Sequence, residues 1–258
     1  MIDTHCHMVY EDADPEPAIE RAGEAGLDAI ITCGYPRDYG KNLGVVEKHP
    51  SFVYLTIGLH PIDVKDMTEA EIEKYLDFIR TLKDRIIGVG EIGLDYHWFP
   101  KEKSPEENEK FKAAFSRCLE LAREIGKPAV LHTRKAEQDC FDMAVSHGLK
   151  DVVFHCYGGN MTLARQIIDQ GYLISLSTNM DRSKNTRKIA QSFPLEQLLT
   201  ETDSPFLSPV PGKKNEPANV KMVVERIAEL RGMDVSEVDR QTTQNARKFF
   251  GLPSEAKA

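Results

Sequence analysis

The feature that most constrains this chain is an alternation, repeated eight times, of a short apolar run and a longer amphipathic segment. Continuous apolar runs of this length are typical of strands that are buried on both faces of a sheet. Apolar positions that recur every three or four residues indicate helices packed on one side. The predicted strands lie near residues 2–7, 28–33, 53–59, 86–92, 128–133, 151–156, 172–177 and 198–203.

The predicted helices fill the intervals between these strands, and some carry local signals for their ends. Thr68 followed by Glu71 predicts a capping box at a helix start, and Gly126 predicts the end of a long helix. A last amphipathic segment ends in Phe249 and Phe250 and is expected to pack across the outside. The predicted helices lie near 16–25, 39–48, 68–83, 105–126, 135–147, 161–170, 183–192, 218–231 and 235–250.

Eight β/α repeats in 258 residues favour an α/β fold of the (β/α)₈ (TIM) barrel type, which typically takes roughly 250 residues. An open doubly wound sheet would place a glycine-rich phosphate turn after its first strand. Here the first predicted strand runs instead into HCHMVYED. We therefore expect residues 1–258 to form a single barrel domain with an extra C-terminal helix.

Composition excludes several classes of protein. The five cysteines form no CxxC pair, which argues against a disulfide framework and a thiolate zinc site. The first residues resemble no signal peptide, and no apolar run has the length of a membrane span, so a cytoplasmic protein is expected. A net charge of −8 argues against a broad duplex-binding surface, but it permits a phosphate ester bound at metal ions.

Polar residues gather where the predicted strands end, and five of the eight histidines are among them. His5 and His7 are two residues apart on one strand, so their rings point to the same face. The carboxyl ends of the strands form the active-site face of a (β/α)₈ barrel. The strand-end candidates are His5, His7, His60, Glu91, His132, His155 and Asp203.

Imidazoles and carboxylates buried together need compensation, and divalent cations supply it. Four such ligands saturate one tetrahedral zinc. Six therefore indicate two metal ions, with a carboxylate able to bridge them. Asp3 and Glu201 lie one layer deeper on the same strand faces and are expected to support the ligands, whereas Cys6 and Cys156 are expected to face outward. The six candidate metal ligands are His5, His7, Glu91, His132, His155 and Asp203.

Three groups of residues near the strand ends are candidates for contact with a substrate, and for two of them a structural role is the alternative. His60 either contacts substrate or caps a turn before Pro61. The aromatic residues at 96, 98 and 99 either stack a nucleobase or form a small core within their own loop. Basic residues at 37, 134, 135, 213 and 214 follow strand ends, and together they predict a local positive rim for a phosphodiester.

Taken together, the motifs resemble those of the TatD-like metal-dependent deoxyribonucleases of the amidohydrolase superfamily. The matching stretches are IDTHCH, GLHP, GVGEIGLDYHW, PAVLHTR, FHCYGG, LLTETDSPFL, NEPANV and TTQNARKFF, in the family's order. Two stretches depart from the family pattern, Ile62-Asp63 after GLHP and Lys213-Lys214 before NEP. Both departures concern substrate binding rather than metal binding.

The resemblance implies a role for each matching residue. One metal ion would be held by His5, His7, Glu91 and Asp203, and a second by Glu91, His132 and His155, with Glu91 as the bridge. Asp203 would also handle the proton of the attacking water, so Asp203 and Glu91 are the implied catalytic residues. The implied contacts to the substrate phosphate are His60, His97 and Arg134.

We therefore expect a hydrolase that uses two divalent ions (Zn, Mg or Mn) to cleave phosphodiester bonds of DNA. Its action is expected to be 3′–5′ exonuclease-like, on single strands or duplex ends, with no membrane and no obligate protein partner. A lactonase, amidase or aminoacyl deacylase on the same barrel is the alternative. A non-catalytic barrel that binds metal or a partner protein is the remote alternative.

Overall fold

A computed structural model of the protein describes residues 1–11, 13–100 and 105–253, and its eight strands run parallel in the order β1 to β8. All eight predicted strands are present, mostly one to three residues shorter than expected. The strands are β1 (Ile2–Cys6), β2 (Ala29–Gly34), β3 (Val53–Ile57), β4 (Gly88–Gly93), β5 (Ala129–His132), β6 (Val152–Phe154), β7 (Leu173–Leu176) and β8 (Leu198–Thr200).

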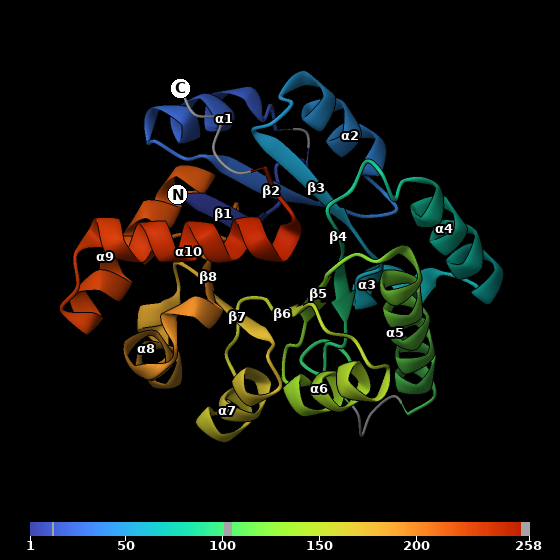
Figure 1. The fold of residues 1–258 in the computed structure, drawn as a ribbon. Helices are drawn as coiled ribbons and strands as arrows, with labels where there is room; N and C mark the ends of the chain where they lie inside the picture. Colours follow the sequence, from blue (N-terminus) through green and yellow to red (C-terminus); the bar gives the residue numbers. More distant parts are fainter. Residues whose placement is uncertain (12, 101–104, 254–258) are drawn as a thin grey trace.

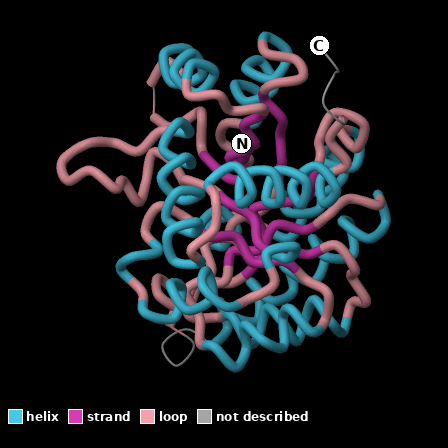
Figure 2. Tube along the Cα trace, turned by 60° about the vertical axis from the view of Figure 1, so that its left-hand side comes forward, coloured by secondary structure: helices cyan, strands magenta, loops and turns pink. Residues whose placement is uncertain are grey.

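The sheet closes on itself where the ends of β1 and β8 meet. The backbone N–H of Asp203 donates to the carbonyl of His5 at 2.9 Å, and that of His7 donates to Ser204 at 2.7 Å. Figure 1 shows the strands arranged in a ring with helices around it, and Figure 2 shows the strands enclosed by helices. The expected (β/α)₈ barrel is confirmed.

The helices follow the predicted alternation with one addition. Helix α3 was not expected; it starts because His60 caps it and Pro61 occupies its first position, where proline fits well. The capping box of Thr68 and Glu71 opens α4 as predicted. The helices are α1 (Glu16–Glu24), α2 (Tyr39–Lys48), α3 (Pro61–Asp66), α4 (Glu69–Thr81), α5 (Pro105–Ile125), α6 (Glu137–Ser146), α7 (Met161–Asp169), α8 (Lys184–Ser192), α9 (Val220–Arg231) and α10 (Val235–Phe250).

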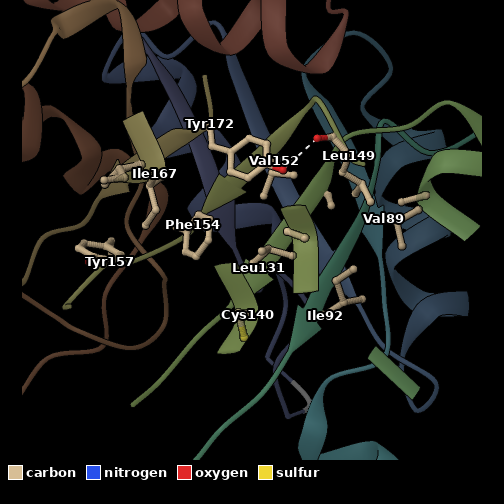
Figure 3. Packing of buried hydrophobic residues seen from close by; sticks show 14 of the residues in the cluster. Val89, Ile92, Leu131, Cys140, Leu149, Val152, Phe154, Tyr157, Ile167 and Tyr172 are labelled. Carbon is tan, nitrogen blue, oxygen red and sulfur yellow. Dashed lines mark hydrogen bonds between the residues drawn. The ribbon is translucent and has the colours of Figure 1, made fainter. Parts of the chain in front are cut away.

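The main hydrophobic core lies between the strands and the surrounding helices. Figure 3 shows part of it, with Leu131 of β5 and Phe154 of β6 among the buried residues. The Tyr172 hydroxyl, just before β7, donates to the Leu149 carbonyl at 2.9 Å, which leaves this buried phenol satisfied.

A second apolar cluster fills the amino-terminal end of the barrel. Phe249 and Phe250 of α10 pack there with Ile2 and Leu199, near the starts of β1 and β8. Helix α10 was expected on the outside, and it covers this end of the barrel (Figure 1). Polar side chains therefore collect at the opposite, carboxyl end. None of the helices in the described part of the chain combines the length and hydropathy needed to cross a membrane.

Candidate metal centre

The six predicted ligands converge at the carboxyl ends of five strands. His5, Glu91 and His132 belong to β1, β4 and β5. His7 and His155 directly follow β1 and β6, and Asp203 lies three residues after the end of β8. Ligand atoms of His5, His7 and Glu91 lie within 4.8 Å of one another, and so do those of Glu91, His132 and His155. Glu91 belongs to both groups, which is the arrangement that a bridging carboxylate requires.

The Glu91 carboxylate is buried at the centre of this cluster. Its Oε1 lies 2.6 Å from His132 Nδ1 and 2.8 Å from His155 Nε2, and its Oε2 lies 3.6 Å from His5 Nε2. Burial acts to raise the pKa of Glu91, but the imidazoles of His155 and His132 bring it well below its usual value. Glu91 is therefore an anion that faces three imidazoles.

His5 has the ring nitrogen whose surroundings best fit a metal ion. Its Nε2 is buried and has no hydrogen-bond partner among the described residues, although it lies 3.8 Å from Asp203 Oδ1 as well as near Glu91. Burial lowers the pKa of His5 and so favours the neutral ring, the form that binds metals. An unsatisfied ring nitrogen between two carboxylates fits a divalent ion, because neutral imidazole and carboxylate are suitable ligands.

Asp203 and His7 form the outer part of the cluster. His7 Nε2 lies 3.2 Å from Asp203 Oδ1. Asp203 adopts a φ of 58°, a left-handed conformation that is uncommon for residues other than glycine. Such backbone strain, of about 1–3 kcal/mol, concentrates at functional sites.

Tyr35 belongs to the site but was not predicted. Its hydroxyl donates to Glu91 Oε2 at 2.5 Å and lies 3.3 Å from His7 Nδ1. Burial, together with the neighbouring Cys33 and Glu91, raises the pKa of Tyr35, so the phenol stays protonated and remains a donor. Its place two residues after the predicted strand 28–33 was the available signal.

Asp95 is a second residue that sequence reasoning missed as a site residue. Its Oδ2 lies 2.9 Å from His132 Nε2, and its Oδ1 accepts the backbone N–H groups of His97 and Trp98 at 2.8 and 2.9 Å. Asp95 thus joins a candidate ligand to the loop between β4 and α5. Its position in the GEIGLDY motif, two residues after the strand, was the signal.

Two deeper carboxylates support the ligands, as strand alternation predicts. Glu201 Oε1 lies 3.4 Å from His155 Nδ1, and its Oε2 accepts the Ser175 hydroxyl at 2.6 Å. Asp3 accepts both the backbone N–H and the hydroxyl of Thr202, the residue before Asp203. Carboxylates behind metal-binding histidines orient the rings and raise their basicity.

The two cysteines that alternate with candidate ligands behave differently. Cys6 faces the helices and packs with Ile19 and Ala22 of α1. Cys156 was also expected to face outward, and this was wrong, because it lines a cavity that opens beside the candidate ligands. Strand β6 ends at Phe154 and Cys156 adopts a φ of 45°, so the alternation of side chains does not extend to it. Burial raises its pKa to about 12, so the thiol is not activated.

A cavity of about 970 Å³ opens above the cluster. His60 and Arg134 line it, as the phosphate-contact prediction requires, but His97 is exposed with its ring 5.2 Å from that of Trp98, outside the lining. The cap interpretation of His60 is confirmed, since its Nδ1 accepts the Ile62 N–H at the start of α3. Its ring also borders the cavity, and contact with substrate stays a prediction.

Only two of the five basic residues predicted to form a positive rim, Arg37 and Arg134, line the cavity. Arg37 lines the cavity but pairs with Asp63, and Arg134 lines it with its guanidinium 5.8 Å from the Trp98 ring centre. Lys41 also borders the cavity, whereas the lysines at 135, 213 and 214 lie outside its lining. Positive charge at the mouth is therefore concentrated on few side chains.

Comparison with known proteins agrees with this geometry. The family model described as TatD related DNase matches residues 2–251. A metal-dependent hydrolase of Methanocaldococcus jannaschii is 39% identical over 252 residues, covering 96% of each chain. Deoxyribonuclease TATDN3 of Homo sapiens is 30% identical, covering 97% of this chain and 94% of its own. A crystal structure of a TatD homologue from Escherichia coli superposes with a TM-score of 0.87 at 27% identity, covering 98% of each chain. The chain belongs to the TatD related DNase family.

Proposed function

We propose that this chain is a divalent-metal-dependent hydrolase that cleaves phosphodiester bonds of DNA. The observation that carries the proposal is the place of Glu91 in two adjoining ligand groups at the carboxyl end of the barrel. A carboxylate shared in this way is suited to a pair of ions, and paired ions are common in nucleases and phosphatases. The relative named a deoxyribonuclease supports DNA as the substrate.

The proposed ligands divide into two sets. One ion is assigned to His5, His7, Glu91 and Asp203, and the other to Glu91, His132 and His155. The unsatisfied Nε2 of His5 supports the first set, and the short distances from Glu91 to His132 and His155 support the second. Oxygen and imidazole donors suit Zn, Mg or Mn. When bound, such ions lower the pKa of a water and stabilise the charge that develops on the phosphate.

The protein's own residues would position the phosphate and accept a proton. We assign to Asp203 the removal of a proton from the attacking water, a role that its partly accessible carboxylate beside His7 supports. His60 has a pKa lowered to about 3 by burial, and its Nδ1 accepts the Ile62 N–H, so its Nε2 carries the proton. That N–H and the Arg134 guanidinium are our candidate phosphate donors, and exposed His97 would contact the strand outside the cavity.

Burial of the cluster favours a free strand end as the substrate. Glu91 lines the cavity and is only 3% exposed, and His5 beside it is 1% exposed. A phosphate must enter the barrel mouth to reach them, and phosphates within a duplex are held in a rigid helix. We therefore propose action on single strands or duplex ends, in the 3′–5′ direction.

The test is cleavage of oligonucleotides labelled at the 3′ or the 5′ end, with purified protein and added Mg²⁺, Mn²⁺ or Zn²⁺. We expect stepwise loss from the 3′ end of single strands, and we expect Glu91→Gln to abolish it and reduce the bound metal. Glu20→Gln, on the exposed face of α1, is the matched control. Intact DNA together with cleavage of a lactone, amide or aminoacyl ester by the same preparation would replace this proposal with the alternative.

A further inference from the structure

The aromatic side chains of the loop between β4 and α5 divide into two kinds. The Tyr96 hydroxyl donates to Asp139 at 2.6 Å, and the Phe99 ring lies 4.8 Å from that of Phe111 in α5. Both rings pack against the main core. Trp98, the only tryptophan of the chain, is 59% exposed and lines the active-site cavity. The loop's own packing therefore uses two aromatic residues and leaves the third at the cavity mouth.

A second exposed aromatic ring borders the same cavity. Phe206 follows β8 and is 42% exposed. Its ring lies 5.0 Å from that of Tyr10 and 5.6 Å from that of His7, each at an edge-to-face angle. These neighbours hold Phe206 beside the candidate ligands while leaving part of the ring open to the cavity.

Topology places the two rings on opposite sides of the metal centre. Strands β4 and β8 are four positions apart in a closed ring of eight, so they face each other across the barrel axis (Figure 1). Trp98 follows β4 and Phe206 follows β8, whereas the ligands from β1, β5 and β6 lie between. Large exposed aromatic rings on both sides of one cavity mark a binding surface rather than a packing surface.

We infer that Trp98 and Phe206 are stacking platforms for the two nucleobases that flank the scissile phosphate. The inference rests on the proposed function and specifies its substrate as an unpaired strand end that still carries its bases. Every base has a π-face, so stacking contributes affinity without selecting a sequence. The guanidinium of Arg134, 5.8 Å from the Trp98 ring centre, would lie between a stacked base and its phosphate.

The experiment removes each ring and each base in turn. Trp98→Ala and Phe206→Ala are assayed on three single-stranded oligonucleotides, one intact, one with an abasic tetrahydrofuran as the last 3′ nucleotide and one with it as the penultimate nucleotide. On the intact strand we expect each variant to lower kcat/KM by about 5- to 100-fold. On the strand that lacks the base stacked by the mutated residue, kcat/KM of the variant should be close to that of the wild-type protein, because the ring has no base left to stack. Met222→Ala, at a 44% exposed apolar residue of α9, is the matched control.

The outcomes separate the inference from the proposed function. If the metal-loaded wild-type protein leaves all three strands intact, the proposed function fails and the inference fails with it. If the intact strand is cleaved but each variant loses the same factor on all three strands, or nothing on any, the platforms do not exist. Trp98→Tyr guards against a misfolded loop, because a smaller aromatic ring should restore most of the lost activity on the two strands that keep the base stacked by residue 98, and little on the strand that lacks it.

Discussion

One carboxyl group connects a candidate metal ligand to the loop that bears the exposed tryptophan: Asp95 Oδ2 lies 2.9 Å from His132 Nε2, while Asp95 Oδ1 accepts the backbone N–H of Trp98. Asp95 is 2% exposed, so water does not replace either bond. The bond to Nε2 leaves the other ring nitrogen, Nδ1, directed at Glu91. Asp95 is thus a positioning residue for both the ligand and the loop.

Asp95→Asn should weaken metal binding by about 10- to 100-fold, the usual effect of losing a hydrogen-bonded partner of a ligand. Calorimetric titration with Mn²⁺ or Zn²⁺ measures this directly. In the wild-type protein, metal binding should also change the fluorescence of Trp98, and in the variant this change should shrink. Asp84→Asn, at an exposed aspartate before β4, is the control. Unchanged affinity and fluorescence in Asp95→Asn would show that the contact is incidental.

The stability of the metal-free protein should be greatest near pH ~6.5, the ordinary pKa of histidine. Burial acts to lower the pKa of His155 and His132, but Glu91 raises both above the ordinary value. Protonation of these two rings therefore stabilises the folded state fully below pH ~6.5, and this contribution is lost as the pH rises through the raised pKa values. Burial lowers the pKa of His5, and that of His60 to about 3. As the pH falls, these two rings are protonated in the unfolded chain before they are protonated in the folded protein, so the stability of the folded protein decreases below pH ~6.5.

Urea unfolding of chelator-treated protein from pH 5 to 9 measures this dependence. In Glu91→Gln the decline above pH ~6.5 should flatten, because the anion that raises the two pKa values is gone. Saturating metal should raise the free energy of unfolding, by about 2.7 kcal/mol at one hundred times its Kd. Stability that rises steadily from pH 6.5 to 9 in the wild-type protein is incompatible with raised imidazole pKa values.

Gly58 should tolerate no side chain, because a Cβ there would collide with the backbone carbonyl of Glu91. Gly58→Ala should lower the free energy of unfolding by about 1–3 kcal/mol and weaken metal binding, since β4 must move to accommodate the methyl group. Gly44→Ala is the matched control, because Gly44 lies within α2 with open space around it. That change should stabilise the protein by about 0.5–1 kcal/mol. Equal stability of the two variants would contradict the close approach.

Phe250 should matter for folding and not for metal binding. It is 5% exposed in the cluster at the amino-terminal end of the barrel, opposite the ligands. Phe250→Ala should cost about 3–5 kcal/mol of unfolding free energy, with an unchanged metal affinity in the fraction that remains folded. Val235→Ala, at a 43% exposed position of the same helix, should change stability by less than about 0.5 kcal/mol. A loss of metal affinity in Phe250→Ala would show that the two ends of the barrel are coupled.

Local rules were sufficient for the strands and the longer helices of the fold. The eight strands and the predicted helices follow from residue periodicity, and the cap of α4 follows from Thr68 and Glu71. Helix α3 was missed because it is only six residues long and carries no apolar period of its own. The signal available was His60 before Pro61, a cap and a favourable first residue.

Local rules failed where the chain leaves the strands. Alternation placed His5 and His7 on one face because β1 extends to Cys6. The same rule misplaced Cys156, which follows the end of β6 with a positive φ. Tyr35 and Asp95 also lie just beyond strand ends, where the direction of a side chain depends on how the loop folds back.

The sequence by itself determined which residues stand at the strand ends and that His5 and His7 share a direction, since both depend on neighbours along the chain. Only the tertiary structure decided that Glu91 lies among three imidazoles, that Tyr35 and Asp95 hold the ligands, and that Trp98 stays exposed. The bond between His7 and Asp203 spans 196 positions. Closure of the barrel brings such residues together, and no local propensity encodes that distance.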